Sequence, residues 1–282
     1  MPQMSPSASP LDIRWRILGT GFRIQPSFWL MSLLFGYVIL VWGGHPRAVA
    51  SPVTYLALWV GCTFVEVLLH EMGHMAAARI FGERSTIILC GTGGLTVGNF
   101  GALARWQRII VSLAGPGVGF GVYFLLVFLE GRIQQWDQAL INNNPLVRDG
   151  YRLLVLMTLF WNLFQLVPII PLDGGMVMKE LVEWPFRRIG TRLAYAASLL
   201  VALSLIAYSG VLFLQQRGGG NMFPPLPSYG LDPIFTAIMV GMLAVENLTA
   251  LLSSRSSSSG EAEPTEERAM ARRHREYEEK EW

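Results

Sequence analysis

The chain has 282 residues, of which 52% are hydrophobic and only 15% are charged, with a formal net charge of +2. Soluble domains carry about a quarter charged residues, so this composition excludes an ordinary soluble protein and favours a membrane protein. The two cysteines, Cys62 and Cys90, are too few for a disulfide framework and lack the spacing of a zinc or redox motif.

The segments follow one another in a simple order. Residues 1–27 contain no apolar stretch ending in a cleavage site, so we expect a cytoplasmic N-terminal segment and no cleaved signal peptide. Residues 28–252 are predicted to form an all-α polytopic domain of about six transmembrane helices, and residues 253–282 a charged cytoplasmic tail. Spanning helices need about 20 apolar residues, and the candidate segments are 28–43, 53–80, 106–130, 151–171, 193–214 and 232–252.

The distribution of positive charge predicts the orientation of these segments. If the N-terminus is cytoplasmic, most of the 22 lysines and arginines fall on the cytoplasmic side. The positive-inside rule then places both termini in the cytoplasm of a multi-pass integral membrane protein, in the cell (inner) membrane if the source is bacterial. The second segment consequently runs inward and ends at the cytoplasmic side.

That second segment contains the sequence His70-Glu71-Met72-Gly73-His74. Histidines four residues apart share one face of a helix and can bind a single metal ion. The glutamate beside the first histidine is placed to act on a metal-bound water. Ionisable groups at membrane depth are costly and usually mark a functional site. We therefore predict a hydrolytic zinc site within the membrane, in its cytoplasmic half.

Two short stretches rich in β-forming residues follow this helix directly, within Ser85–Val97, and a glycine turn separates them. They predict a short β-hairpin associated with the membrane. An exposed strand here would be able to hold an extended peptide by β-augmentation.

A third zinc ligand is needed, and the remaining histidines, His45 and His274, lie in a far-side loop and in the tail. Asp173 is the better candidate, because it closes the fourth segment on the cytoplasmic side, after Pro168 and Pro171. Prolines and the glycines that follow break a helix there. Taken alone, Asp173 would be read as a turn or cap residue.

With these motifs in place, the chain resembles the site-2 protease family of intramembrane zinc metalloproteases. The resemblance rests on the histidine motif, on Leu172-Asp173-Gly174-Gly175 and on Ser112-Leu113-Ala114-Gly115-Pro116, and it covers roughly residues 12–252. It implies that His70, His74 and Asp173 bind one zinc ion per chain and that Glu71 is the general base. Family members often carry an asparagine where this chain has Gln165, with Asn162 one turn earlier.

The resemblance implies an endopeptidase that cuts transmembrane substrates in or near the cytoplasmic half of the bilayer. Asn162 or Gln165 is then the candidate to bind substrate or stabilise the oxyanion. Glu66, one turn before the first histidine, either orients it, pairs with an arginine or lines a wet cavity. The expected partners are a transmembrane protein substrate, a regulatory membrane protein and the lipid bilayer, with no nucleic acid. The alternative is a non-proteolytic membrane protein that binds metal or helices.

Overall fold

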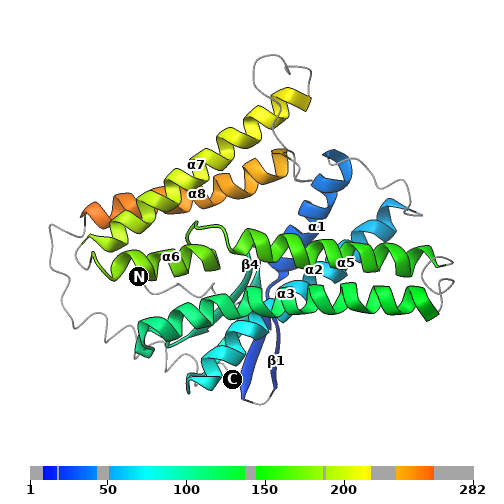
Figure 1. Cartoon of the computed structure of the whole chain (residues 1–282), viewed down its shortest axis with the longest axis horizontal. Helices are drawn as coiled ribbons and strands as arrows, with labels where there is room; N and C mark the ends of the chain where they lie inside the picture. The colour runs from blue at the N-terminus through cyan, green and yellow to red at the C-terminus, as the bar shows by residue number, and fades with distance from the viewer. Residues whose placement is uncertain are drawn as a thin grey trace.

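The computed structural model describes residues 9–17, 19–42, 51–136, 144–186, 189–216 and 233–256. Helices dominate this part of the chain, and one small sheet lies beside them (Figure 1). The predicted charged tail after Ser256 and the predicted loop around His45 fall outside the described residues.

Six helices occupy the six apolar segments expected from the sequence: α1 (Pro26–Trp42), α2 (Pro52–Ile80), α3 (Arg105–Trp136), α5 (Pro145–Gln165), α7 (Gly190–Gln216) and α8 (Pro233–Ser256). Four of them, α2, α3, α7 and α8, are long and apolar enough to cross a membrane, which indicates an integral membrane protein. Helix α1 is shorter, and α5 carries three charged residues near its start, Arg148, Asp149 and Arg152. Length and composition therefore support four of the six expected spans.

Helix α2 is central to the arrangement. It packs against α3 and α5, which also pack against each other, and it contacts the strands at its other side. Helices α7 and α8 run side by side as a separate pair (Figure 1). A further helix that the sequence did not predict, α6 (Asp173–Glu183), packs against both α3 and α7 and so joins the two groups.

The sheet is larger than the predicted hairpin. It has the order β1 (Ile13–Ile17), β2 (Thr20–Ile24), β3 (Ser85–Cys90) and β4 (Gly93–Gly98). The β3–β4 pair is the expected antiparallel hairpin, while β2 pairs in parallel with β3 and antiparallel with β1. Two strands therefore come from the segment expected to be only an N-terminal extension.

An apolar core explains why the N-terminal strands join the sheet. Phe22 and Ile24 of β2 are buried with Ile87 and Leu89 of β3 against Val67 of α2. Burying such side chains stabilises by about 1.5–3 kcal/mol each. The sheet is thereby fixed to the middle of α2, immediately before the histidine motif.

The chain breaks between α5 and α6, as the prolines predict. Helix α5 ends at Gln165, and α6 begins at Asp173 after an irregular turn that contains Pro168 and Pro171. Helix α6 is tied to α3 by an ion pair in which Arg108 Nε and Nη2 lie 2.6 and 2.8 Å from the carboxylate oxygens of Glu180. Helix α6, which begins with Asp173, is therefore fixed to α3 after the break.

Candidate metal centre

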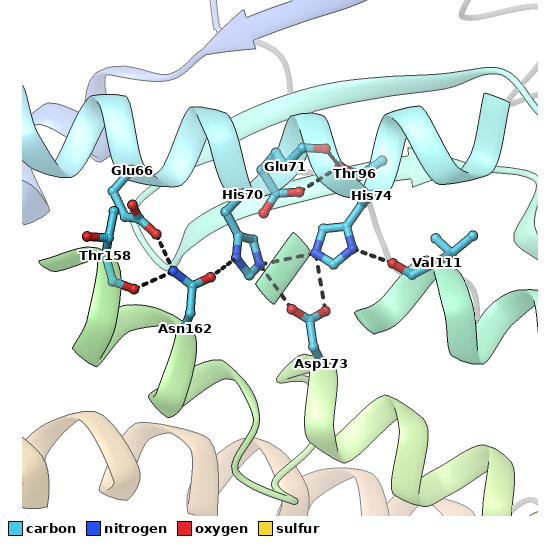
Figure 2. Close-up of polar contacts among 9 residues, drawn as sticks. All are labelled: Glu66, His70, Glu71, His74, Thr96, Val111, Thr158, Asn162 and Asp173. Atoms are coloured by element: carbon cyan, nitrogen blue, oxygen red, sulfur yellow. Dashed lines mark hydrogen bonds and ion pairs between the residues drawn. The ribbon is translucent and has the colours of Figure 1, made fainter. Parts of the chain in front are cut away.

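Helix α2 carries the two motif histidines on one face. His70 and His74 are buried, and their Nε2 atoms lie 3.1 Å apart (Figure 2). Gly73 between them allows α3 to approach closely, because a Cβ there would come within 2.5 Å of the carbonyl oxygen of Ala114. The histidines thus lie where two helices cross without side chains between their backbones.

Hydrogen bonds at the other ring nitrogens determine the tautomer of each histidine. His74 Nδ1 lies 2.7 Å from the carbonyl oxygen of Val111, which can only accept, so Nδ1 carries the proton and donates. His70 Nδ1 donates in the same way to Asn162 Oδ1, at 2.9 Å. In the neutral imidazole each Nε2 therefore presents its lone pair, and both Nε2 atoms face the same space.

The orientation of the Asn162 amide is fixed by two further acceptors. Its Nδ2 donates to Glu66 Oε1 at 2.5 Å and to the carbonyl oxygen of Thr158 at 2.6 Å, so Oδ1 must face His70 (Figure 2). Asn162 is fully buried and both of its amide hydrogens are in use. No donor is left for an oxyanion. The geometry therefore assigns Asn162 to orienting His70 and does not support the oxyanion role expected from the sequence.

The other two residues expected near the site differ in their positions. Glu66 is buried and reaches His70 through Asn162, which agrees with the orienting alternative. Gln165 is half-buried at the last position of α5. Of the two candidate amides, Asn162 is the one that contacts a motif histidine.

Asp173 approaches the same space from the opposite side. Its Oδ2 lies 3.0 Å from His70 Nε2, and its Oδ1 lies 3.3 Å from His74 Nε2 (Figure 2). The side chain of the first residue of α6 thus meets both histidines, although about 100 residues of chain separate them. The three expected ligands come together.

This group of atoms fits a zinc ion. The three groups lie 3.0 to 3.3 Å apart, close to the roughly 3.3 Å between ligands of tetrahedral zinc. In the neutral form of both histidines, no hydrogen lies between these electron-rich atoms, and a bound metal cation would satisfy all three at once. Two imidazoles and one carboxylate form a ligand set of catalytic zinc sites, which keep a fourth position for water.

Helix α3 leaves the space for such an ion. A Cβ at Gly115 would overlap the His74 ring and lie 2.8 Å from His70 Nε2, and a Cβ at Gly119 would overlap the Asn162 amide. A Cβ at Gly117, by contrast, would meet nothing within 4 Å. Two glycines one turn apart therefore face the site, and the intervening one does not.

Glu71 lies beside the ligand group but is held by the sheet. Its Oε2 accepts a hydrogen bond of 2.6 Å from Thr96 Oγ1, a residue of β4 (Figure 2). Its carboxylate lies within 4.8 Å of the ring nitrogens of His70 and His74, whereas Asp173 is nearer to both. Glu71 is thus placed to act on a water in the open position, and Asp173 is the better ligand.

Strand β4 lies against the carboxylate of Glu71, since a Cβ at Gly94 would overlap that carboxylate. Within the described residues β4 is an edge of the sheet, while β3 is paired on both sides. An extended peptide can therefore form strand hydrogen bonds with β4. In the described sheet, strand β3, which includes Thr86–Leu89, has no unpaired edge for such a peptide.

Two contributors were not found from the sequence. Thr96 shares one face of β4 with Gly94 because residues two apart in a strand point the same way, but this pattern is visible only once the strand is placed on α2. The Val111 carbonyl that fixes His74 is a backbone group. Every residue has such a carbonyl, so the identity of residue 111 does not reveal this role.

Comparisons with known proteins agree with this geometry. No protein-family model matches the chain. It is 30% identical over 180 residues to a Synechocystis protein named "Putative zinc metalloprotease", covering 59% of this chain and 42% of that protein. It is 26% identical over 170 residues to a zinc metalloprotease of Methanocaldococcus jannaschii, covering 60% and 44% of the two chains. The chain thus spans less than half the length of these curated relatives.

The fold is also found among solved structures. The site-2 protease from Methanocaldococcus jannaschii superposes with a TM-score of 0.50 at 20% sequence identity, over 83% of this chain and 95% of that chain. The chain is thus a helical membrane protein that is similar in sequence to zinc metalloproteases and in fold to a site-2 protease. The comparisons confirm the similarity to the site-2 protease family that the motifs indicate.

Proposed function

We propose that this protein is an intramembrane zinc endopeptidase that hydrolyses peptide bonds of transmembrane protein substrates in the cytoplasmic half of the bilayer. One observation carries the proposal: His70 Nε2, His74 Nε2 and the Asp173 carboxylate converge within 3.0 to 3.3 Å with their lone pairs facing one another. A metal ion at this point would be bound by all three groups at once, and the carboxylate of Glu71 lies beside it.

The residues around the ligands have separate tasks in this proposal. Bound zinc would polarise the scissile carbonyl and make a water molecule acidic enough to react near neutral pH. Glu71 accepts the proton of that water and returns it to the leaving amine. Thr96 holds the Glu71 carboxylate in place through its hydroxyl hydrogen. Asn162 and the Val111 carbonyl keep the histidine rings in the orientation that presents Nε2.

Strand β4 supplies a means of holding the substrate. A transmembrane helix hides its peptide bonds in its own hydrogen bonds, so it must unwind before cleavage. An unwound segment that pairs with the edge of β4 would replace those bonds by strand hydrogen bonds. Because Gly94 and Thr96 face Glu71, a peptide on this edge lies next to the proposed base.

The deciding experiment separates metal binding from catalysis. Glu71→Gln should keep zinc, because the ligands are intact, but it should abolish cleavage, because an amide does not accept the proton of the water. His70→Ala and Asp173→Ala should lose zinc and cleavage together. Glu246→Gln, the same chemical change in the membrane helix α8, is the matched control and should retain both.

Zinc per protein is measured on protein purified in detergent, and cleavage is followed on a transmembrane substrate found by comparing membrane proteomes of cells carrying the wild type or Glu71→Gln. Continued cleavage by Glu71→Gln would remove Glu71 as the base. Full zinc in Asp173→Ala would mean that the third ligand is another residue. A wild type that binds zinc but yields no proteome difference from Glu71→Gln would favour the non-proteolytic alternative.

A further inference from the structure

The turn that carries Asp173 has an unusual environment. Between α5 and α6 the backbone is not helical, yet Ile169 and Ile170 are buried among the helices. Backbone groups buried without water must find partners within the protein. One hydrogen bond is formed within the turn, because the Leu172 N–H donates to the Ile169 carbonyl oxygen at 2.8 Å.

The peptide groups of Ile170 instead depend on two side chains from other helices. The Ile170 N–H donates to Ser198 Oγ of α7 at 3.0 Å, and the Ile170 carbonyl oxygen accepts from Asn247 Nδ2 of α8. Ser198 and Asn247 are 0% and 1% exposed. Asn247 also donates to the Leu243 carbonyl oxygen at 2.7 Å in its own helix, which fixes its orientation.

Polar side chains buried in membrane-spanning helices are costly unless they are hydrogen-bonded. The same turn and the same two helices contribute an apolar cluster that includes Ile169, Ala202 and Val240. In the described structure the bond to Ile170 is the contact that takes Ser198 beyond its own helix. Ser198 and Asn247 therefore share one partner, the Ile170 residue of the turn, to which both form a hydrogen bond.

The turn and the start of α6 lie backbone against backbone. A Cβ at Gly174 would overlap the backbone of Leu166, and a Cβ at Gly175 would overlap the backbone of Ile169. The first turn of α6 is thus packed directly on the irregular segment. Only Pro171, whose φ is fixed by its ring, and Leu172 lie between Ile170 and Asp173.

We infer that Ser198 and Asn247 are positioning residues that set the place of Asp173 in the metal site by holding the Ile170 peptide. The α7–α8 pair thereby controls the affinity of the site for metal, although neither residue touches the site itself. This inference rests on the proposed function, because it takes Asp173 as a ligand.

The test uses pairs of side chains that differ only in hydrogen bonding. Threonine and valine have the same shape, so Ser198→Thr and Ser198→Val add the same bulk, but only threonine keeps the hydroxyl. Asn247→Leu removes the amide at similar volume. Ser204→Val is the control, since the Ser204 hydroxyl donates to Leu200 in its own helix. Each full-length protein is purified in detergent, stripped of metal and titrated with Co²⁺ against a competing chelator.

Ser198→Val should bind Co²⁺ about tenfold more weakly than Ser198→Thr, and Asn247→Leu about tenfold more weakly than wild type, as for other residues that orient ligands. The visible spectrum of bound Co²⁺ should change in both, which a general loss of stability would not produce. Ser204→Val should match wild type.

Two results would overturn the inference, and they have different meanings. Equal Co²⁺ affinity for the threonine and valine variants, with wild-type affinity in Asn247→Leu, would show that the pair does not position the ligand. If Ser198→Val does not fold, Asn247→Leu decides the matter by the same criterion. Undiminished Co²⁺ binding by Asp173→Ala would instead refute the ligand set of the proposed function.

Discussion

The sharpest test of the site is a single methyl group on α3. Gly115→Ala places a Cβ in the space between the two histidines, where it would overlap the His74 ring and come within 2.8 Å of His70 Nε2. Gly117→Ala, two residues along the same helix, places its Cβ where nothing lies within 4 Å. The two variants make the same chemical change, so helix propensity cancels between them; alanine is favoured by about 1 kcal/mol in both cases.

The size of the effect follows from the geometry. Ordinary contact with a Cβ begins at 3.4 Å, so His70 Nε2 at 2.8 Å must retreat by several tenths of an ångström, and the His74 ring by more. Zinc–ligand distances tolerate about 0.2 Å. Overpacking a buried site costs about 1–3 kcal/mol, which corresponds to roughly 5- to 150-fold in affinity. We expect Gly115→Ala to bind zinc at least about fivefold more weakly than Gly117→Ala.

The assay is zinc content and zinc affinity, by chelator competition, of both variants and wild type purified in the same detergent. Elution as a folded species of the same size confirms that Gly115→Ala is intact. If Gly115→Ala binds zinc as tightly as Gly117→Ala, the space beside the histidines is not the metal site, and the placement of α3 against α2 is wrong.

Three further predictions concern other parts of the molecule. Thr96→Val should lower kcat at least tenfold with zinc content unchanged, because a hydrogen bond to a charged group contributes about 1.5–3 kcal/mol; Thr96→Ser should restore it, and equal kcat in both would show that the hydroxyl is idle. Reporter fusions within 1–27 and 253–282 should both read as cytoplasmic; a far-side signal from either would contradict the charge-based orientation. Burial acts to raise the pKa of Asp12, but a backbone hydrogen bond and the Arg23 guanidinium outweigh it and hold that pKa below its ordinary 3.8. Asp12→Asn should therefore lower Tm near neutral pH, and the difference should shrink as the pH falls through 3.8 and below; a constant difference would exclude the ion pair as its cause.

The positions of the helices could be predicted because each is a local property of the chain. Apolar runs mark the six helices, four of which are long and apolar enough to span a membrane, and Pro168 and Pro171 follow the end of α5. The pairing of His70 with His74 was equally accessible, since residues four apart must share a face of a helix. The contact of Asp173 with them could be anticipated only from charge-based topology and the family motif.

Long-range packing decided the rest. The segment around Phe22 joins β3 because its apolar side chains are buried against α2, and a strand partner 65 residues away is not encoded in the local pattern. Ser85–Val97 predicted a hairpin, but only the order of the sheet makes β4 the edge strand beside Glu71.

The sequence by itself determined which side chains are able to bind zinc, because ligand chemistry belongs to residue types at short spacings. The tertiary structure alone decided what holds them. Asn162 was predicted as one of two amides near the site, and only the structure shows that its amide hydrogens go to Glu66 and Thr158 while its oxygen accepts from His70. Ser198 and Asn247 are ordinary polar residues in apolar helices until the fold brings them to one peptide unit. Such roles depend on which buried polar groups meet across the fold, and that is settled only when every helix is in place.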